Sequence, residues 1–293
     1  MRDDVAVFIL THKRPDNQRT VATLERYKYT GKVFLVIDDE DPTGPEYVKR
    51  YGDQVVVFSK SDAAKYTDDA DNSGSTRGVV YARNACWGIA ERLGLRYFIV
   101  LDDDYVSFSY RFMPDLTYSH QQAKQTLGDM WLSILEYFES CPQLTCVALS
   151  QGGDHIGGGG SSYNKRAIVT KRKVMNWFLC AVDRPFRFYG RINEDTTAYA
   201  VQGRRGLVFL TLMQVQLDQQ PTQQQSGGLT ELYLDSGTWV KSFMSLIYAP
   251  SCVRVDAMGS PQERQAAHDR IHHRMVWNLA APMIVPESTR KPR

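Results

Sequence analysis

The first 105 residues alternate between short apolar runs and longer segments with apolar residues at helical spacing. Short apolar runs predict buried strands, and the segments between them predict helices with one apolar face. The pattern predicts a strand Val5–Leu10, a helix from about Asp16 to Tyr29, strands Val33–Ile37 and Gln54–Phe58, a helix Gly78–Leu93 and a strand Tyr97–Leu101. Alternation of this kind is typical of a parallel sheet with helices on its faces.

The rest of the chain continues with strands and helices in a less regular order. Leu127, Trp131 and Phe138 share one side of a long amphipathic segment, which predicts a helix. The expected elements are a helix Gln121–Ser140, a strand Cys146–Leu149, a helix Asp195–Gln202, a strand Gly206–Met213, a short helix and a strand within Gly237–Val255, and a helix Gln262–Leu279. Apolar residues recur at neither helical nor strand spacing in three segments, which are therefore predicted to be loops: Ser61–Thr76, Gln151–Ser162 and Gln214–Gly228.

Length and composition limit the class of protein. The chain has 293 residues, 43% of them hydrophobic and 23% charged, as expected for a soluble globular protein with a sizeable core. We therefore predict an α/β fold, with a mixed, mainly parallel sheet flanked by helices in a single domain. The net charge of +2 excludes a polycation, so a nucleic-acid contact requires a local basic patch. The sequence favours no membrane partner, and its five scattered cysteines favour a reduced, cytoplasmic setting.

Three consecutive aspartates, Asp102, Asp103 and Asp104, follow the apolar run of the Tyr97–Leu101 strand. Open α/β sheets bind their ligands at the carboxyl ends of parallel strands. Adjacent carboxylates repel one another unless a cation or basic side chains neutralise them, and Mg²⁺ and Mn²⁺ prefer oxygen ligands. The pattern indicates a divalent-metal site, with an acidic turn that caps the next helix as the simpler alternative.

A second acidic cluster, which begins with Asp38 and Asp39, follows the Val33–Ile37 strand. Two parallel strands would place their acidic ends side by side at one edge of the sheet. One end would bind the metal, and Asp38 or Asp39 would accept hydrogen bonds from a base or a ribose. A plain polar turn explains Asp38 and Asp39 equally well.

The segment 151–162 contains six glycines in twelve residues and predicts a mobile loop. A basic stretch follows directly and provides five candidates for contact with a DNA backbone: Lys165, Arg166, Lys171, Arg172 and Lys173. A surface linker and a solvated strand edge are the alternatives. The loop lacks the Gly-Lys-Ser or Gly-Lys-Thr ending of a phosphate-binding loop, which disfavours a nucleoside triphosphatase.

Glu194 and Asp195 open a predicted helix, where acidic side chains interact favourably with the helix dipole. The functional alternative is that one of them is a general base. Near the C-terminus, His268 and His272 lie one turn apart on the predicted last helix, and His273 is adjacent. These histidines are candidates for structural roles or for metal ligands.

With these motifs in order, the chain resembles a GT-A glycosyltransferase over almost its whole length. In that fold an Asp-x-Asp element at a strand end holds a divalent metal on the diphosphate of a nucleotide sugar, and Asp102-Asp103-Asp104 matches it. The resemblance implies Asp102 and Asp104 as metal ligands, completed by His272 or His273, and Asp102 and Asp103 as donor contacts. It also implies Asp195, with Glu194 second, as the catalytic base.

The same resemblance implies further contacts to the donor. They are Thr11 and Arg14 in the loop after the first strand, Asp38 or Asp39 on the base or ribose, and Arg77, Arg83 and Asn84 near the helix before the metal strand. Residues 1–105 would then form the nucleotide-sugar-binding half, and residues 106–293 the acceptor-binding and catalytic half with its Gly-rich loop. An inverting reaction needs the Asp195 base and a retaining one does not, so both stereochemical outcomes stay open.

More specifically, the chain resembles the TET-associated glycosyltransferases of bacteriophages, through FIVLDDDY (98–105), GGLTELYLDSGTWVKSF (227–243) and IHHR (271–274). That resemblance implies transfer of a sugar from a nucleotide sugar to 5-hydroxymethylcytosine in phage DNA. The expected donor is a uridine diphosphate sugar. It implies Mn²⁺ or Mg²⁺ as cofactor and the cytoplasm of an infected bacterium as location. The alternatives are a GT-A enzyme with a polysaccharide or protein acceptor, a metal-dependent nucleotidyltransferase, and a catalytically silent DNA-binding module.

Overall fold

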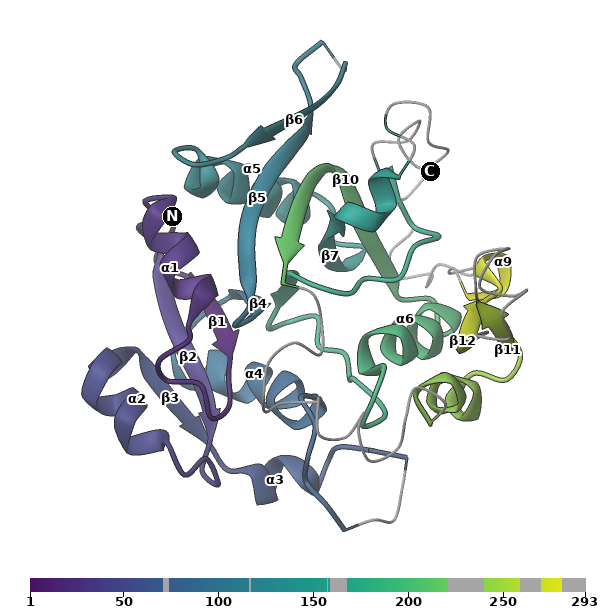
Figure 1. The fold of residues 1–293 in the computed structure, drawn as a ribbon, viewed down its shortest axis with the longest axis horizontal. Coiled ribbons are helices and arrows are strands. Elements are labelled where there is room, and N and C mark those ends of the chain that lie inside the picture. Colours follow the sequence, from purple (N-terminus) through teal and green to yellow (C-terminus); the bar gives the residue numbers. More distant parts are fainter. Residues whose placement is uncertain are drawn as a thin grey trace.

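The computed structural model describes residues 1–70, 74–115, 117–156, 158, 168–220, 240–258 and 270–280 (Figure 1). Strands and helices alternate in its first half. They are β1 (Val5–Leu10), α1 (Arg19–Arg26), β2 (Lys32–Asp38), α2 (Gly44–Tyr51), β3 (Val55–Phe58), α3 (Lys60–Ala64), α4 (Val80–Arg92) and β4 (Tyr97–Asp102). The predicted first three strands and the Asp-rich strand are therefore present.

The second half extends the same sheet. Its elements are β5 (Tyr105–Phe112), β6 (Tyr118–Gln122), α5 (Leu127–Ser140), β7 (Leu144–Gln151), β8 (Ile168–Val169), β9 (Phe178–Ala181), α6 (Glu194–Arg204) and β10 (Val208–Gln219). The strand order is β3-β2-β1-β4-β9-β7-β10-β5-β6, and β8 pairs with β10. Strands β3, β2, β1 and β4 are parallel, as are β7 and β10, whereas β9 runs antiparallel to both β4 and β7. The predicted α/β class with a mixed sheet flanked by helices is confirmed.

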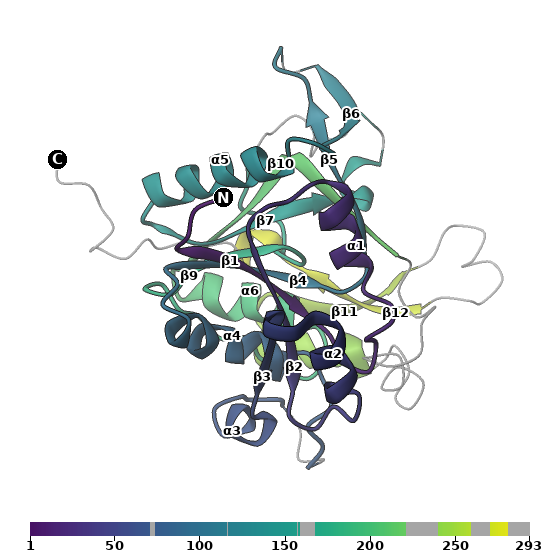
Figure 2. The ribbon, with the colours of Figure 1, turned by 90° about the vertical axis from the view of Figure 1, so that its left-hand side faces the viewer.

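Two apolar layers cover the two faces of the sheet. On β1, Ala6, Phe8 and Leu10 face the layer formed by α4 and α6, whereas Val5, Val7 and Ile9 face the layer of α1 and α5. This alternation follows from the two-residue period of a strand. Figure 2 shows α1 and α5 on one side of the sheet and α4 and α6 on the other.

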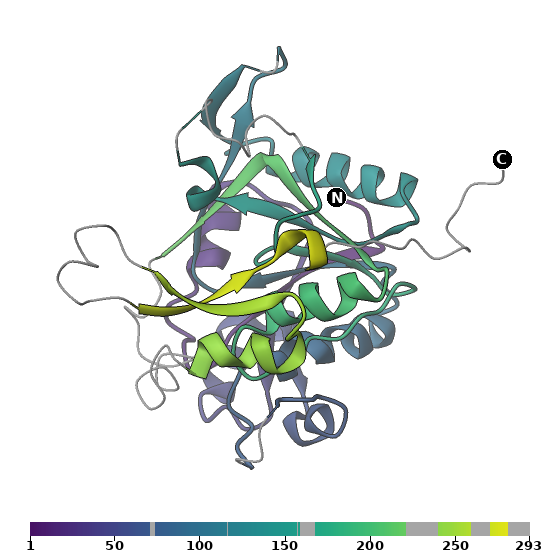
Figure 3. The ribbon, with the colours of Figure 1, turned by 90° about the vertical axis from the view of Figure 1, so that its right-hand side faces the viewer.

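A smaller antiparallel pair, β11 (Val253–Met258) and β12 (Arg270–Met275), lies beside α6 together with helical residues 240–248 and α9 (Trp277–Ala280) (Figure 3). The predicted helix Gln262–Leu279 is therefore wrong over Arg270–Met275, because pairing with β11 overrides the local helical pattern. His268 lies outside the described residues. Within the described part of the chain, none of the helices has the length and apolar character needed to cross a membrane.

Three other boundaries differ from the prediction. Helix α1 begins at Arg19, because the buried Gln18 side chain donates to Thr11 and to the Arg14 carbonyl and ties this segment to the end of β1. Helix α5 begins at Leu127, because residues 118–122 pair with β5. Strand β10 runs on to Gln219 through the predicted loop. Val215 and Leu217 are buried, and the side-chain oxygens of Gln216 and Gln219 accept hydrogen bonds.

Candidate active site

The carboxyl ends of β1, β2 and β4 meet at one edge of the sheet, because these strands are parallel and in register. Leu10 pairs with Val36 on one side and with Asp102 on the other. Residues Thr11 to Arg14, Asp38 and Asp102 to Asp104 therefore gather at one edge, as the sequence predicted, but β1 lies between the two acidic strand ends, which are not side by side. This is the position at which open α/β sheets bind ligands.

Asp103 is the anchored member of the aspartate triplet. Thr11 Oγ1 donates to Asp103 Oδ2 at 2.7 Å, and Arg14 Nη1 donates to Oδ1 at 3.0 Å. Burial raises the pKa of Asp103, while Arg14 and Thr11 oppose this shift. Both carboxylate oxygens are thus used inside the protein, and Asp103 holds the loop after β1 against the end of β4.

Asp102 and Asp104 flank this anchor and are more accessible. The side chain of Asp102 is 31% exposed, and Asp104 is half-buried. Burial, together with the charges of Asp102 and Asp103, raises the pKa of Asp104 to about 7. A carboxylate that is disfavoured by two like charges is stabilised by a cation, so this pair fits a hard divalent ion.

The aspartates do not form a complete metal site by themselves. Among the residues that the structure describes, no group of three or more His, Cys, Asp or Glu side chains is arranged to hold a metal ion. Mg²⁺ commonly binds through one or two carboxylates, with substrate phosphates and water as its other ligands. Asp102 and Asp104 match that kind of site.

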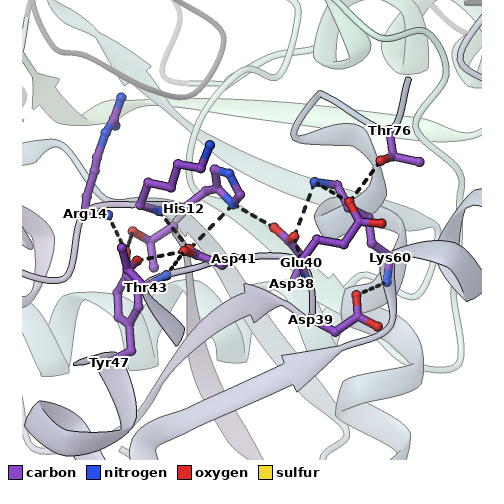
Figure 4. Close-up of polar contacts among 12 residues, drawn as sticks. His12, Arg14, Asp38, Asp39, Glu40, Asp41, Thr43, Tyr47, Lys60 and Thr76 are labelled. Atoms are coloured by element: carbon purple, nitrogen blue, oxygen red, sulfur yellow. Dashed lines mark hydrogen bonds and ion pairs between the residues drawn. The ribbon is translucent and has the colours of Figure 1, made fainter. Parts of the chain in front are cut away.

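The end of β2 forms a second polar cluster, around Asp38 (Figure 4). His12 Nδ1 lies 2.9 Å from Asp38 Oδ2, and Lys60 Nζ lies 3.3 Å from Oδ1. The backbone N–H of Glu40 also donates to Oδ1 at 3.2 Å. Burial alone would raise the pKa of Asp38, but His12 and Lys60 hold it below its ordinary value. Asp38 is therefore an ionised, fully used carboxylate, and its contacts orient His12 and Lys60.

Asp39 differs from Asp38 in its surroundings. It is exposed, and its Oδ1 accepts a hydrogen bond from the Lys60 backbone N–H at 2.9 Å, at the start of α3. His12 also lies 3.5 Å from Asp41, whose buried carboxylate accepts hydrogen bonds from the backbone N–H groups of Lys13 and Thr43. The sequence had not singled out His12, Asp41 or Lys60 as individual site residues, although His12 lies in the loop between Thr11 and Arg14 and Asp41 lies in the second acidic cluster.

We expect Asp38→Asn and Asp39→Asn to separate these two roles. The Asp38 variant removes the nearer carboxylate of the buried Lys60 amine and leaves only the more exposed Glu40 at 3.7 Å, which costs about 2–3 kcal/mol of unfolding free energy and weakens nucleotide binding. The exposed Asp39 variant serves as the matched control and should lose less than about 1 kcal/mol. Urea unfolding and titration with uridine diphosphate measure both quantities, and a larger effect at Asp39 would reverse the assignment.

Glu194 and Asp195 form the first turn of α6, as predicted. Asn193, which precedes them, has a left-handed backbone (φ 59°), and its Nδ2 donates to the Lys241 carbonyl at 2.7 Å. Glu194 is buried, and its Oε1 lies 3.2 Å from Arg83 Nε. Asp195 is half-buried and is the more accessible of the two carboxylates. The geometry therefore gives the two acids different surroundings.

The predicted donor contacts near α4 have different environments. Arg83 is buried, and its Nη2 donates to Asp102 Oδ1 at 3.4 Å. Asn84 is buried too, and its amide is used by the Phe188 backbone N–H and carbonyl, at 2.9 and 3.0 Å, and by Thr67. Arg77 is exposed in the segment before α4, and its carbonyl accepts a hydrogen bond from Arg191. Asn84 therefore fixes the chain around Phe188 in this structure.

The two predicted histidines lie on β12, near the start of α6. His273 is buried, and its Nδ1 lies 3.2 Å from Asn193 Nδ2. Burial, with Lys173 and His272 nearby, lowers the pKa of His273 to about 3, so its ring is neutral. A neutral imidazole is the form that binds metals. Because Asn193 donates to Nδ1, the proton of His273 lies on Nε2, and a ligand role for His273 requires this contact to be released.

The basic stretch divides into buried and exposed members. Arg172 Nε and Nη2 donate to the two oxygens of Asp154 at 2.6 and 3.0 Å, so this buried guanidinium is used internally. Lys173 is half-buried; burial lowers its pKa, and the nearby Asp195 charge opposes the shift. Lys171 is exposed. Lys165 and Arg166 lie outside the described residues.

Acidic groups thus lie at the carboxyl ends of the parallel strands β2 and β4, on either side of β1, and Arg83 links the end of β4 to the helix that opens with Glu194 and Asp195. The model of the family described as TET-Associated Glycosyltransferase matches residues 5–228. The chain therefore belongs to the TET-associated glycosyltransferase family and is a glycosyltransferase. No curated protein sequence matches it significantly.

Several solved structures share a similar arrangement of the chain at low sequence identity. One is the mannosyltransferase PcManGT from Pyrobaculum calidifontis in complex with GDP-Man and Mn²⁺, with 11% identity, a TM-score of 0.48, and 92% of this chain and 69% of that chain covered. Another is GalNAc-T7 with UDP, GalNAc and Mn²⁺, with 12% identity, a TM-score of 0.46, and 73% and 43% covered. A third is S. aureus TarS 1–349, with 11% identity, a TM-score of 0.40, and 73% and 60% covered. Because these scores lie below 0.5, family membership rests on the sequence match.

Proposed function

We propose that this glycosyltransferase moves a sugar from a nucleoside diphosphate sugar, with the uridine form as first candidate, to the hydroxyl of 5-hydroxymethylcytosine in phage DNA. The observation that supports this most is the continuous polar edge from Asp38 through Thr11 and Asp103 to Asp102 and Asp104. Such an edge offers contacts for a nucleoside at one end and for a metal-bound diphosphate at the other.

On the donor side, we assign Asp102 and Asp104 to a divalent cation, Mn²⁺ or Mg²⁺, with His272 or His273 as a third candidate ligand. When bound, such a cation supplies Lewis-acid stabilisation of the charge on the departing diphosphate. Asp38 holds His12 and Lys60 at the nucleoside end. The exposed Arg77, beside the start of α4, is a further candidate for the donor's phosphates.

On the acceptor side, Asp195 is placed to receive the proton of the acceptor hydroxyl in an inverting transfer. The hydroxyl oxygen then bonds to the sugar's anomeric carbon, and the nucleoside diphosphate leaves with the electrons of the broken bond. Asp195 suits this role better than Glu194, because Asp195 is only half-buried and Glu194 is buried against Arg83. Positioned general bases contribute about 10²–10⁴-fold to such steps.

Family membership supports DNA as the acceptor. In the described part of the basic stretch, Lys171 is exposed and is the candidate for a phosphate contact, whereas Arg172 is used by Asp154. A hydroxymethyl group in the major groove is partly accessible, and extrusion of the base would bring it to Asp195.

The proposal predicts sugar transfer that requires the hydroxymethyl group. The chain is incubated with Mn²⁺, a panel of nucleotide sugars, and two DNA duplexes that differ only in cytosine or 5-hydroxymethylcytosine. Mass spectrometry of the digested nucleosides should show a glycosylated product from the second duplex alone. A wild-type enzyme that modifies a polysaccharide or protein but neither duplex would refute the DNA acceptor. Product formation only from a sugar phosphate plus a nucleoside triphosphate would indicate a nucleotidyltransferase instead.

A further inference from the structure

Arg83 is a buried arginine that lies between the donor-side and acceptor-side carboxylates. It belongs to α4, is 4% exposed, and contacts two other elements. Its Nη2 donates to Asp102 Oδ1 at 3.4 Å at the end of β4, and its Nε lies 3.2 Å from Glu194 Oε1 at the start of α6. One guanidinium therefore connects the strand that carries the aspartates with the helix that carries Asp195.

Aromatic rings fix the position of this guanidinium. Its carbon lies 4.7 Å from the ring centre of Phe178 and 5.4 Å from that of Phe188, within the range of cation–π contacts. The backbone of Phe188 is itself held by Asn84, the residue after Arg83. The guanidinium thus lies against aromatic rings on one side and forms ion pairs with Asp102 and Glu194, and the charge of Asp195 also acts on it.

The hydrogen bonding of Arg83 is incomplete for so buried a group. Nη1 is buried and makes no hydrogen bond within the described part of the chain, and the Nε contact with Glu194 is an ion pair that lacks hydrogen-bond geometry. Buried polar groups are normally satisfied, and an exception requires an explanation. An arginine kept for stability alone would be expected to use more of its five N–H groups.

The two partners of Arg83 differ in accessibility. Asp102 keeps a 31% exposed side chain towards the polar edge, whereas the side chain of Glu194 is only 5% exposed. Glu194 is therefore poorly placed to meet an acceptor, but it immediately precedes the more accessible, half-buried Asp195. Holding Glu194 fixes the first turn of α6, and with it the place from which Asp195 acts.

We propose that Arg83 is a positioning residue that sets the acceptor-side base, Asp195, relative to the donor-side carboxylates by joining Asp102 to Glu194. This inference rests on the proposed function of the same site. Arg83 acts in this arrangement through its two ion-pair partners, and Glu194 serves as its buried counter-ion. A lysine cannot replace the arginine here, because one ammonium on a flexible stem lacks the planar fork that reaches two carboxylates.

A double-mutant cycle with Arg83→Lys and Glu194→Gln tests this inference. Each single variant should lower kcat of sugar transfer roughly 10²-fold, since small misplacements of reacting groups cost about that much. The double variant should be no slower than the slower single variant, because both changes break the same connection. Binding of Mn²⁺ with uridine diphosphate should not weaken in Arg83→Lys, because lysine keeps the positive charge beside Asp102 and neither side chain is a ligand of the cation.

Arg184→Lys is the matched control. Arg184 also lies over a phenylalanine ring, Phe138 at 4.0 Å, and donates to the Cys141 and Leu144 carbonyls, away from the aspartates. It should lose stability without loss of kcat. Losses that multiply in the double variant, or an Arg83→Lys variant whose nucleotide binding falls as much as its kcat, would overturn the positioning role.

The same four enzymes are also compared by their rates of donor hydrolysis, a reaction in which water replaces the acceptor. A wild-type enzyme that hydrolyses the donor but does not modify DNA refutes the proposed acceptor, and the cycle then still decides the role of Arg83. If the losses of the two single variants in hydrolysis add up in the double variant, and the wild type transfers sugar to DNA normally, the positioning role is refuted and the proposed function is left intact.

Discussion

An Asp104→Asn variant is expected to fold normally and to lose sugar transfer by roughly 10³-fold, because charge stabilisation by a bound metal is worth several kcal/mol. Asparagine keeps the volume of the side chain but removes one of the two accessible carboxylates of the triplet. The rate is measured as donor turnover at saturating Mn²⁺. Undiminished Mn²⁺-dependent turnover in this variant would exclude Asp104 from the metal site.

Stability as a function of pH provides the control for folding. The pKa of Asp104 is raised from the ordinary value of 3.8 to about 7, so between these values the folded wild type binds a proton that the unfolded chain does not. Without metal, wild-type stability therefore falls as the pH rises through this window, and the fall is smaller in Asp104→Asn, where buried Glu194, whose pKa is also raised to about 7, still contributes. Stabilisation of the wild type by Mn²⁺ should increase as the pH passes about 7, because the ligand must be deprotonated.

An Asp195→Asn variant is expected to lose about 10²–10⁴-fold in kcat of transfer while binding Mn²⁺ and uridine diphosphate as the wild type does. The amide has nearly the same shape, and its oxygen can still accept the hydrogen bond of the Thr196 N–H, but it cannot take a proton. Transfer kinetics and nucleotide titration separate the two quantities.

Glu194→Gln is the comparison that distinguishes the two acids. It also slows transfer, but through Arg83, so its loss in kcat should be smaller than that of Asp195→Asn. A larger loss of kcat in Glu194→Gln than in Asp195→Asn would make Glu194 the base. Normal kcat in Asp195→Asn would favour a reaction that needs no base at this position.

The acidic edge of the sheet was predictable from the sequence because its causes are local. The apolar run before Asp102 dictates a buried strand, and the strand–helix alternation dictates parallel strands with their carboxyl ends together. The structure brings Thr11, Arg14 and Asp103 into contact at that edge. The different roles of the three aspartates were not predictable, because they depend on which carboxylate accepts hydrogen bonds from the loop after β1.

Long-range contacts set the limits of the sequence prediction. Arg172 and Lys171 carry the same charge in one basic stretch, yet Arg172 is buried because a distant carboxylate, Asp154, receives it. The connection made by Arg83 depends on α4, β4 and α6 meeting in space, and on the insertion of β9 beside β4, which places Phe178 under the guanidinium. Neither feature leaves a periodic signal in the sequence.

Two misassigned segments show how local patterns mislead. Residues 214–219 are rich in glutamine and suggested a loop, but Val215 and Leu217 alternate with polar residues and continue β10 into the core. Residues Arg270–Met275 lie within a helix-like composition, yet they pair with β11. In both cases the register with a neighbouring strand outweighs the intrinsic preference of the segment.

The most direct test of the donor site is anomalous diffraction at the manganese edge from a crystal grown with Mn²⁺ and uridine diphosphate. The account predicts an anomalous peak beside Asp102 and Asp104, next to the diphosphate, with the nucleoside towards His12 and Asp38. A peak at another place on the molecule, or nucleotide bound with the Asp102 and Asp104 side chains turned away from it, would contradict the account.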